Sequence, residues 1–269
     1  MVIQHNIAAN NAYRNLSANA SNGQKNLEKL SSGYRINRSA DDAAGLAISE
    51  QMRSKINGLD QATSNASDAI GLIQTAEGAL TETHSMLQRM VTLATQSANG
   101  TYNSTARTAI GAEVTALKEE LNRIASTTDY NGVKPLNQTV SITVQIGPTA
   151  GEKLQIASAK MGSSALSVAD VDVSSTSNAN AAITKINKAI NTVSTHRAKL
   201  GASQNRLEHT INNLKTTNEN MTAAESRIRD TDMAKEMAAF TKNNILNQAA
   251  QSMLSQANQQ PQGVLSLLR

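Results

Sequence analysis

A heptad seam in the first half of the chain constrains the fold more than any other feature of the sequence. Thirteen positions from 52 to 94 are spaced alternately by four and three residues, and ten of them are apolar. A seam of about six heptads is typical of a coiled-coil-like helix that packs against partner helices along its length. We expect a helix from about Asp42 to Ser97, roughly 80 Å long at about 1.5 Å per residue. A compact globule of 269 residues does not need so long a helix.

The residues before this helix indicate where it begins. Ser39 and Asp42 have the S-x-x-D form of a capping box, and the carboxylates of Asp41 and Asp42 suit the positive end of a helix. The same carboxylates are a weaker candidate for acid–base chemistry, because adjacent side chains on a helix diverge. We therefore predict that this segment caps the long helix.

Two further heptad patterns predict partner helices. Residues 110–124 repeat the four-three spacing over a helix of about twenty residues, and we expect it to fold back on the first. Fourteen positions from 183 to 228 carry the pattern again, and ten of them are Ile, Val, Leu or Met. The remaining four are Arg197, Gln204, Asn218 and Glu225. Polar residues in a seam cost stability but fix register and partner, so they suit a bundle that assembles in one way.

Composition favours narrow helical seams over a bulky core. The chain has no Trp, one Phe and four Tyr, so the usual large core fillers are scarce. All three prolines lie outside residues 1–134 and 149–260, and proline is poorly tolerated inside a helix. The predicted fold class is mainly α: a long antiparallel coiled-coil-like helical bundle built from both arms of the chain, with a small β-hairpin region in the middle.

Between the arms the hydrophobic period changes to two, the value for a strand. Apolar and polar residues alternate from Val140 to Ile146, a Gly- and Pro-containing turn follows at 147–151, and Leu154 and Ile156 come next. This pattern predicts a small β-hairpin. The stretch from 158 to 180 is rich in Ser, Ala and Asn, and we expect it to be a surface connection.

The two ends of the chain carry sparser apolar residues, which are candidates for an interface. They are Ile3, Ile7, Leu16, Leu27 and Leu30 at one end, and Met237, Phe240, Ile245, Leu246, Met253, Leu254, Val264, Leu265, Leu267 and Leu268 at the other. Helices with few strong anchors are marginal alone in water. We expect both termini to be disordered in the monomer and to become helical when they pack against one another or against neighbours.

The methionines of the C-terminal stripe allow three interpretations. Met233, Met237 and Met253 are core residues, or they form an adaptable partner surface, because methionine repacks easily. The third interpretation is a helix that lies on a membrane. Asn and Gln dominate the polar face where basic residues would be expected, so the membrane is the least favoured of the three.

Charge, cysteine content and hydropathy exclude several classes of function. The 25 basic residues are spread among 21 acidic ones, and aromatic rings for stacking bases are few, so we expect no nucleic-acid partner. The chain has no cysteine, which excludes disulfides and thiolate metal sites. No run approaches the roughly 20 apolar residues that span a bilayer, and the N-terminus lacks the pattern of a Sec-type signal peptide. We expect no membrane insertion.

The sequence shows no catalytic motif. Four scattered histidines, His5, His84, His196 and His209, lack the spacing of metal ligands. We interpret them as structural, with His84 as a candidate pH-sensitive packing residue on the seam. Nucleophile-elbow, P-loop and dinucleotide-binding glycine patterns are absent from the sequence. We expect no enzyme activity, no metal and no cofactor.

Five segments of the chain resemble the bacterial flagellin family, in the family's order. They are LSSGYRINRSADDAAGLAIS (30–49), LQRMVTLATQSANG (87–100), TDYNGVKPL (128–136), LGASQNRLEHTINNL (200–214) and QANQQPQGVLSLLR (256–269). The likeness spans residues 1–135 and 178–269. It implies terminal helices at 1–38 and 230–269 that form a filament-core domain, a helical core domain at 39–136 and 178–229, and a short β-hairpin or variable region at 137–177.

The resemblance also implies a function and partners. A flagellin is the extracellular structural subunit that polymerises into the helical filament used for swimming, and it is exported unfolded through the flagellar type III channel. The implied partners are further copies of the chain, a flagellar export chaperone, and the filament cap and hook-junction proteins. The expected chaperone contacts on the C-terminal helix are Ile245, Leu246, Met253 and Leu254.

Animal flagellin receptors of the Toll-like class recognise a family motif that resembles Q-R-x-R-[DE]-L, followed by an acidic residue on the next helix. The residues that fit, with the acidic counterpart last, are Gln88, Arg89, Leu93 and Glu113. Val91 and Thr92 stand where a second arginine and its acidic neighbour are usual. A guanidinium makes several directed bonds that valine cannot replace, so we expect weak receptor activation.

Two other functions stay open at this point. A hook–filament junction protein shares the terminal features but adapts or caps the filament. The compact size and the ending ANQQPQGVLSLLR favour a flagellin over that alternative. A cytosolic coiled-coil adaptor is the alternative from a different class.

Overall fold

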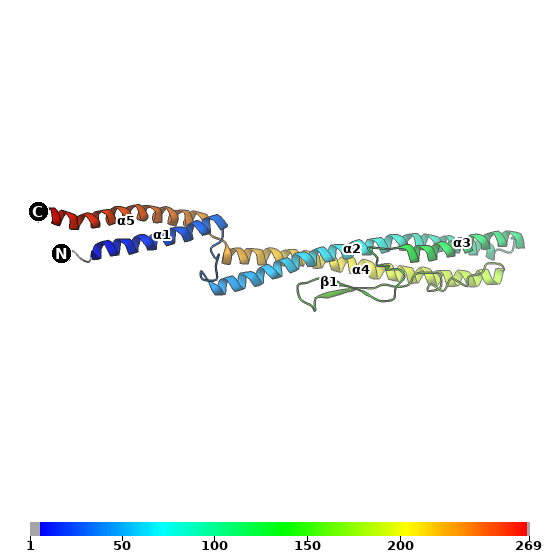
Figure 1. Ribbon diagram of the computed structural model, residues 1–269. Coiled ribbons are helices and arrows are strands. Elements are labelled where there is room, and N and C mark those ends of the chain that lie inside the picture. The colour runs from blue at the N-terminus through cyan, green and yellow to red at the C-terminus, as the bar shows by residue number, and fades with distance from the viewer. Residues whose placement is uncertain (1–5, 268–269) are drawn as a thin grey trace. The chain divides into compact units, whose positions relative to one another are not determined.

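The computed structural model describes residues 6–267, with side chains described as far as residue 260. The described elements, in chain order, are α1 (Ile7–Ser32), α2 (Ala43–Ala98), α3 (Ser104–Thr127), β1 (Ile142–Gln145), β2 (Lys153–Ile156), α4 (Thr176–Arg229) and α5 (Met233–Leu267) (Figure 1). The chain divides into two compact units. We call them the terminal unit (1–56 and 219–269) and the central unit (57–218). The fold is mainly α with one hairpin, as predicted.

The start of α2 follows the predicted position with a different capping residue. Asp42 precedes the helix, and its Oδ1 accepts a hydrogen bond from the Gly45 N–H at 2.9 Å. Asp41 turns away and accepts from the backbone N–H groups of Arg38 at 3.1 Å and Asn37 at 3.2 Å. These two bonds, that of Arg38 first, lower the pKa of the Asp41 carboxyl. The capping box that started at Ser39 was therefore wrong, because Asp42 itself occupies the N-cap position.

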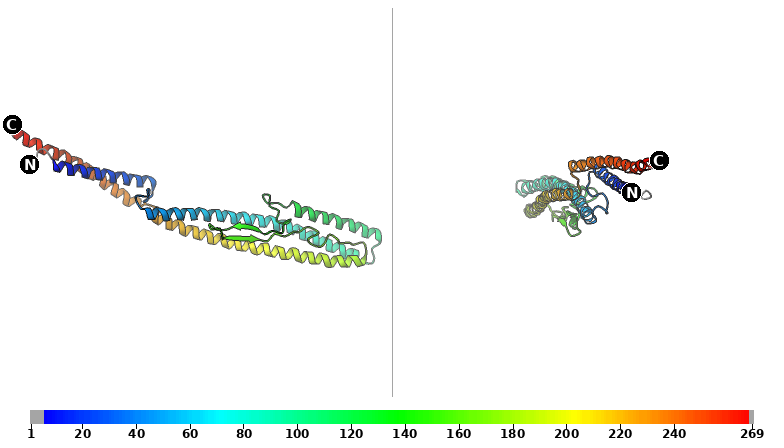
Figure 2. Two further views of the ribbon diagram at one scale, coloured as in Figure 1. Left: turned by 60° about the horizontal axis from the view of Figure 1, so that its bottom comes forward. Right: turned by 90° about the vertical axis from the view of Figure 1, so that its left-hand side faces the viewer.

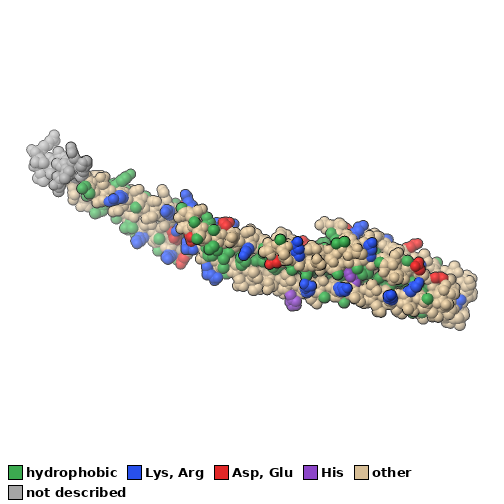
Figure 3. Space-filling view, turned by 90° about the horizontal axis from the view of Figure 1, so that it is seen from below, with side chains coloured by type: hydrophobic (Ala, Val, Ile, Leu, Met, Phe, Trp, Pro, Cys, Tyr) green, Lys and Arg blue, Asp and Glu red, His purple; other side chains and the backbone are tan. Residues whose placement is uncertain are grey.

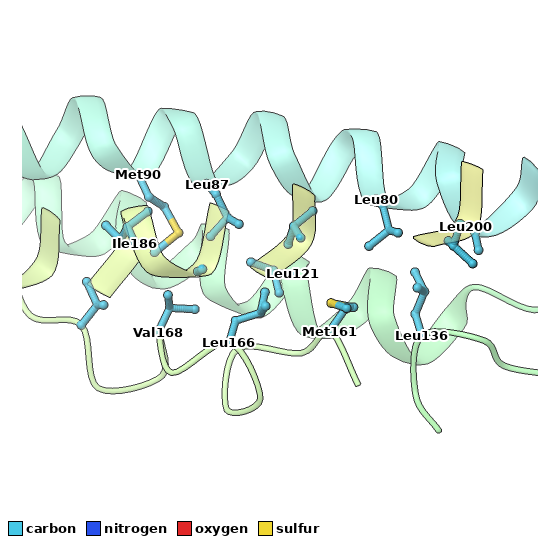
Figure 4. Packing of buried hydrophobic residues seen from close by; sticks show 14 of the residues in the cluster. Leu80, Leu87, Met90, Leu121, Leu136, Met161, Leu166, Val168, Ile186 and Leu200 are labelled. Atoms are coloured by element: carbon cyan, nitrogen blue, oxygen red, sulfur yellow. The ribbon is translucent and has the colours of Figure 1, made fainter. Parts of the chain in front are cut away.

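The core of the central unit is built from helical seams and the connecting chain. Figure 4 shows side chains from α2, α3 and α4 pointing toward one another, together with residues of the segment between the hairpin and α4. The largest buried side chains include Leu80, Leu87, Met90, Leu121, Ile186 and Leu200. Leucine, isoleucine and methionine fill this narrow core, in line with the scarcity of aromatic residues.

Helix α3 folds back along α2, as its heptad spacing predicted (Figure 2). Arg107 of α3 donates its Nε to the carbonyl of Ser97 at 3.1 Å and an Nη2 to the carbonyl of Asn99 at 3.0 Å. Carbonyls at the end of a helix have no donor within that helix. The Arg107 side chain therefore closes the connection between α2 and α3.

Two polar residues of the α4 seam meet polar partners on α2. Arg197 lies 3.4 Å from Glu77, and the Nδ2 of Asn218 donates to the Oδ1 of Asp60 at 2.7 Å. Gln204 instead contacts Glu208 of its own helix at 3.1 Å. Two polar pairs at separate levels penalise a shift of α4 along α2, because a shift would separate both.

The hairpin pairs β1 with β2 in antiparallel register, with Val144 opposite Leu154 and Ile142 opposite Ile156. Leu154 and Ile156 are buried, whereas Val140 lies outside the strand and is exposed. The Nδ2 of Asn65 in α2 donates to the carbonyl of Gln145 at 3.1 Å, which ties the hairpin to the helix. The predicted hairpin is confirmed.

The segment from 158 to 180 is not the surface connection that its composition suggested. Its apolar residues Met161, Leu166, Val168, Val171 and Val173 are buried in the core of the central unit (Figure 4). The Nζ of Lys118 in α3 donates to the carbonyls of Ala169 at 3.1 Å and Val171 at 3.2 Å. The Ser-, Ala- and Asn-rich composition concealed the apolar residues that cover this side of the helices.

Helices α1 and α5 lie side by side in the terminal unit (Figures 1 and 2). Among the described residues, α1 and α5 are the one pair of helices with several Cα–Cα distances of 8 Å or less between them. Helix α5 also continues past Pro261 to Leu267. Proline has no N–H to donate to the carbonyl four residues earlier, so the carbonyl of Ala257 is left without its helical partner.

Candidate functional site

The seam between α1 and α5 is made mostly of small and polar side chains. The half-buried or buried positions of α1 include Ala9, Ala12, Leu16, Asn19, Gly23, Asn26 and Leu30, and those of α5 include Glu236, Phe240, Asn243, Asn247, Ala250, Leu254 and Ala257. Both sets follow the alternating three-four spacing of a two-helix seam. The alanines and the glycine of α1 allow the close backbone approach.

The larger apolar side chains of these helices mostly face away from the seam. Exposed ones are Ile7, Tyr13 and Leu27 on α1, and Met233, Met237, Ile245, Leu246 and Met253 on α5. Ile245 and Met253 are 60% and 62% exposed. Figure 3 shows hydrophobic side chains on the surface of this part of the chain. We call the eight exposed residues the outer apolar face.

The predicted interface residues therefore fall into two groups. Leu16, Leu30, Phe240 and Leu254 belong to the seam within the chain, whereas Ile7, Leu27, Met237, Ile245, Leu246 and Met253 belong to the outer apolar face. Ile3 and Leu268 lie outside the described residues, as do the side chains of Val264, Leu265 and Leu267. Residue type alone did not separate the two groups, because both consist of large apolar side chains.

Polar contacts cross the seam at two levels. Near the start of α1, the Nδ2 of Asn6 donates to the carbonyl of Ala257 at 2.8 Å. With its amide oriented to satisfy its neighbours, Asn26 donates to Glu236 at 2.9 Å and accepts from the Nδ2 of Asn243 at 3.0 Å. Asn6 and Asn26 were not among the interface residues predicted from the sequence, although each is a polar residue at a seam position.

The α1–α2 and α4–α5 connections of the terminal unit are hydrogen-bonded to each other. The Arg35 N–H donates to the Arg229 carbonyl at 2.7 Å, and the Thr231 N–H donates to the Gly33 carbonyl at 3.0 Å. Gly33 ends α1 at φ 75°, a left-handed conformation that favours glycine. The side chain of Arg229 lies 4.7 Å from the centre of the Tyr34 ring, which is within cation–π range.

Arg229 also forms an ion pair with α2. Its Nη1 lies 2.7 Å from the Oε1 of Glu50, and this hydrogen bond is the main cause that lowers the pKa of the Glu50 carboxyl. Arg53 contacts the same carboxylate at 3.3 Å but is more exposed. The Arg229 side chain is only 12% exposed. The ends of α1, α2 and α4 are thus held together by one arginine.

The receptor candidates occupy α2 and α3 of the central unit. Arg89 is paired with Glu113, with 2.8 Å between Nη2 and Oε1. Gln88 is exposed and lies 3.0 Å from the Nε2 of His84. Leu93 is buried, so its side chain cannot contact a partner in this fold, and this candidate is corrected. Because α2 is covered on more than one side, its buried arc is wider than a single seam and includes Leu93.

The histidines and carboxylates show no gathering of ligands. Across the described part of the chain, no group of three or more His, Asp or Glu side chains is placed to hold a metal ion. His196 is buried on α4, and burial, with a contribution from Lys199, lowers its pKa from 6.5. A neutral buried imidazole is a packing residue.

Comparison with known proteins assigns the family. The model of the bacterial flagellin N-terminal helical region matches residues 3–141, and that of the bacterial flagellin C-terminal helical region matches residues 183–268. The chain is also 55% identical to a flagellin of Halalkalibacterium halodurans over 272 aligned positions, covering all of both chains. This chain belongs to the bacterial flagellin family. Flagellins are structural proteins, and membership of the family implies that this chain is a structural subunit of the flagellar filament.

Two solved structures relate the flagellin fold to this chain. The crystal structure of Bacillus cereus flagellin is 32% identical, with a TM-score of 0.52, and covers 60% of this chain and 94% of that one. A putative flagellar hook-associated protein from Vibrio parahaemolyticus is 12% identical, with a TM-score of 0.59, and covers 71% of this chain and 100% of that one. The second likeness concerns the fold alone. In the described portion of this flagellin, no helix has the length and hydropathy required to cross a membrane.

Proposed function

We propose that this flagellin polymerises by burying the outer apolar face of its α1–α5 pair against neighbouring copies. The observation that supports this most is the division of roles within the pair. Mostly small and polar side chains fill the contact inside the chain, while Ile245, Met253 and the other large apolar side chains of the outer apolar face remain exposed. Large apolar side chains that remain exposed in the single chain are candidates for an interaction site.

The same surface supports an open polymer. When a chain contacts a different patch on the next copy, repetition gives a ring or a helical filament. The termini, at 1–38 and 230–269, then form the filament core. Before assembly the termini are disordered in our proposal, because an exposed apolar helix pair with a seam of small and polar residues is marginal in water.

The proposal extends to export and to a chaperone. An unfolded chain without cysteine passes through the flagellar type III channel with no disulfide to reduce. In the cytosol, an export chaperone covers Ile245, Leu246 and Met253, which lie on the outer apolar face, and Leu254, which the chaperone reaches when α1 is unpaired. The filament cap and the hook-junction proteins meet the same terminal surfaces at the ends of the polymer.

Recognition by a Toll-like flagellin receptor is a second proposed property, and it is weak. Gln88 is exposed, and Arg89 and Glu113 pair with each other across α2 and α3. An arginine that already has a carboxylate partner gains less from a receptor acceptor, since the existing pair must be broken. Signalling by wild type equal to that of a Val91→Arg/Thr92→Asp variant in a receptor-reporter assay would contradict this proposal.

Seeded elongation tests the main proposal. Purified full-length chain is added to sheared filament fragments, and growth is followed by light scattering and electron microscopy. Wild type should elongate the seeds, whereas chains that lack residues 1–30 or 235–269 should not, although circular dichroism should still show a helical 42–228 core. A hook–filament junction protein would bind seed ends without long growth, and a coiled-coil adaptor would leave the seeds unchanged; either result would overturn the proposal.

A further inference from the structure

Asn6 makes two different hydrogen bonds at the start of α1. Its Oδ1 accepts from the backbone N–H of Ala9 at 3.0 Å, which caps the helix. Its Nδ2 donates to the carbonyl of Ala257 in α5 at 2.8 Å, across the seam. Capping needs only the acceptor, and Ser or Asp would supply it equally well. The amide donor therefore makes a contact that a capping residue does not require.

The carbonyl that Asn6 contacts is one that α5 cannot satisfy by itself. In an α-helix each carbonyl accepts from the N–H four residues later. The fourth residue after Ala257 is Pro261, which has no N–H, yet the helix continues to Leu267. A carbonyl without a donor is costly when it is shielded from water. Proline thus distinguishes one carbonyl of α5 from its neighbours.

Such a distinction matters because much of the seam discriminates poorly between registers. Ala9, Ala12 and Gly23 offer small surfaces, so apolar packing at these levels favours no single register strongly. Asn19 and Asn26 are one heptad apart on the same seam, so a slide of α1 by one heptad brings one asparagine to the level of the other. The Ala257 carbonyl has no such repeat, and a slide would leave it and the Asn6 donor both unpaired.

We propose that Asn6 is the positioning residue that sets the register of α1 against α5, by donating its side-chain amide to the carbonyl that Pro261 leaves without a donor. Asn26 contacts Glu236 and Asn243 at a second polar level, but Asn19 takes its place after a slide of one heptad, so that level does not distinguish these two registers. The link to assembly rests on the proposed function, since a single register gives every copy the same outer apolar face.

Disulfide trapping measures this register directly. The native chain has no cysteine, so a Gly23→Cys/Asn247→Cys chain has one possible intrachain disulfide. The two positions are neighbours across the seam, because a Cβ built on Gly23 lies 3.8 Å from the Nδ2 of Asn247. The rate of disulfide formation in the full-length chain, below the concentration at which it polymerises, reports how often the helices meet in this register.

Asn6→Ser is the informative variant, because serine keeps the cap but is too short to reach Ala257. The trapping rate should fall about tenfold, the factor that corresponds to about 1.4 kcal/mol. The matched control is Asn10→Ser, the same chemical change at an exposed position of α1, and its trapping rate should equal that of the parent chain. A rate for Asn6→Ser equal to that of the control would overturn the proposal.

Pro261→Ala separates a register contact from a general effect on stability. The new N–H at position 261 satisfies the Ala257 carbonyl within α5. In that background Asn6→Ser should lower the trapping rate by less than about twofold, because the two positions are coupled through one acceptor. An equal loss in both backgrounds would mean that Asn6 does not act through this carbonyl.

The trapping and elongation assays together distinguish a wrong register assignment from a wrong filament role. If Asn6→Ser slows trapping as expected while wild-type chain fails to elongate seeds, the register assignment stands and the filament role of the outer apolar face is wrong. If wild-type chain elongates seeds while Asn6→Ser traps at the parent rate, the register assignment is wrong.

Discussion

Ile245→Asp tests whether the outer apolar face is buried between subunits. Ile245 is 60% exposed in the single chain. Burying a whole isoleucine side chain contributes roughly 1.5–3 kcal/mol, so burying the exposed part contributes about 1–2 kcal/mol per subunit. Aspartate loses that contribution and adds the cost of desolvating an unpaired carboxylate. Since about 1–2 kcal/mol changes an equilibrium by a factor of roughly 5–30, the critical concentration for elongation should rise by at least that factor.

Leu254→Asp places the same charge on the other side of α5. Leu254 is half-buried in the seam within the chain, so its replacement should abolish both elongation and disulfide trapping between positions 23 and 247. Ile245→Asp should weaken elongation only, through the raised critical concentration, with trapping at the parent rate. Lys242→Gln, at an exposed position of α5, is the neutral control and should elongate like wild type.

Sedimentation of polymer at a series of subunit concentrations gives the critical concentration for each variant. An Ile245→Asp chain with the wild-type critical concentration would show that this face is not buried in the polymer. Loss of trapping in Ile245→Asp would show instead that the side chain stabilises the pair within one chain. Either result would refute the division between the seam and the outer apolar face.

Three further predictions concern stability. Burial lowers the pKa of His196 from 6.5, so the unfolded chain binds more protons than the folded one, and stability should decrease as the pH falls through about 6.5. His196→Leu should therefore make the thermal midpoint less dependent on pH between about pH 7.5 and 5 than the control His209→Leu does. Leu87→Ala, at a fully buried position, should lower the free energy of unfolding by about 2–5 kcal/mol in urea titrations, whereas exposed Thr92→Ala should change it little. A Cβ at Gly23 meets no atom closer than 3.8 Å, so Gly23→Ala should stabilise α1 in the helix pair by about 0.5–1 kcal/mol. The measurement is disulfide trapping in a chain with cysteines at other seam positions. A slower trapping rate with Gly23→Ala than without it would contradict this prediction.

Local sequence patterns were enough to predict an element wherever one face of it packs against one partner. The four-three spacing predicted the ends of α2 to within one residue and indicated α3 and α4, which begin six and seven residues before their patterns. The alternation around Val144 and Leu154 predicted the hairpin. These signals survive because the period of apolar residues follows directly from helix or strand geometry. The polar residues Arg197 and Asn218 were also expected to specify register, and both meet polar partners on α2.

Prediction failed where burial came from a second partner or from an irregular segment. Leu93 looked available for a receptor, but α2 is covered on more than one side and the residue is buried. Residues 158–180 looked like a surface connection, yet Met161 and Val168 enter the core. Neither Met161 nor Val168 lies in a long periodic pattern, so the spacing of apolar residues along the chain could not show what packs on them.

The sequence by itself determined the helical class, the lengths of the long helices, the place of the hairpin and the membership of the flagellin family. Only the tertiary structure decided which apolar residues of α1 and α5 fill their own seam and which remain exposed. It also brought Asn6 to the carbonyl of Ala257, about 250 residues along the chain. The physical reason is that periodicity reports which residues share a helix face, whereas the partner of each face depends on contacts between residues remote in sequence.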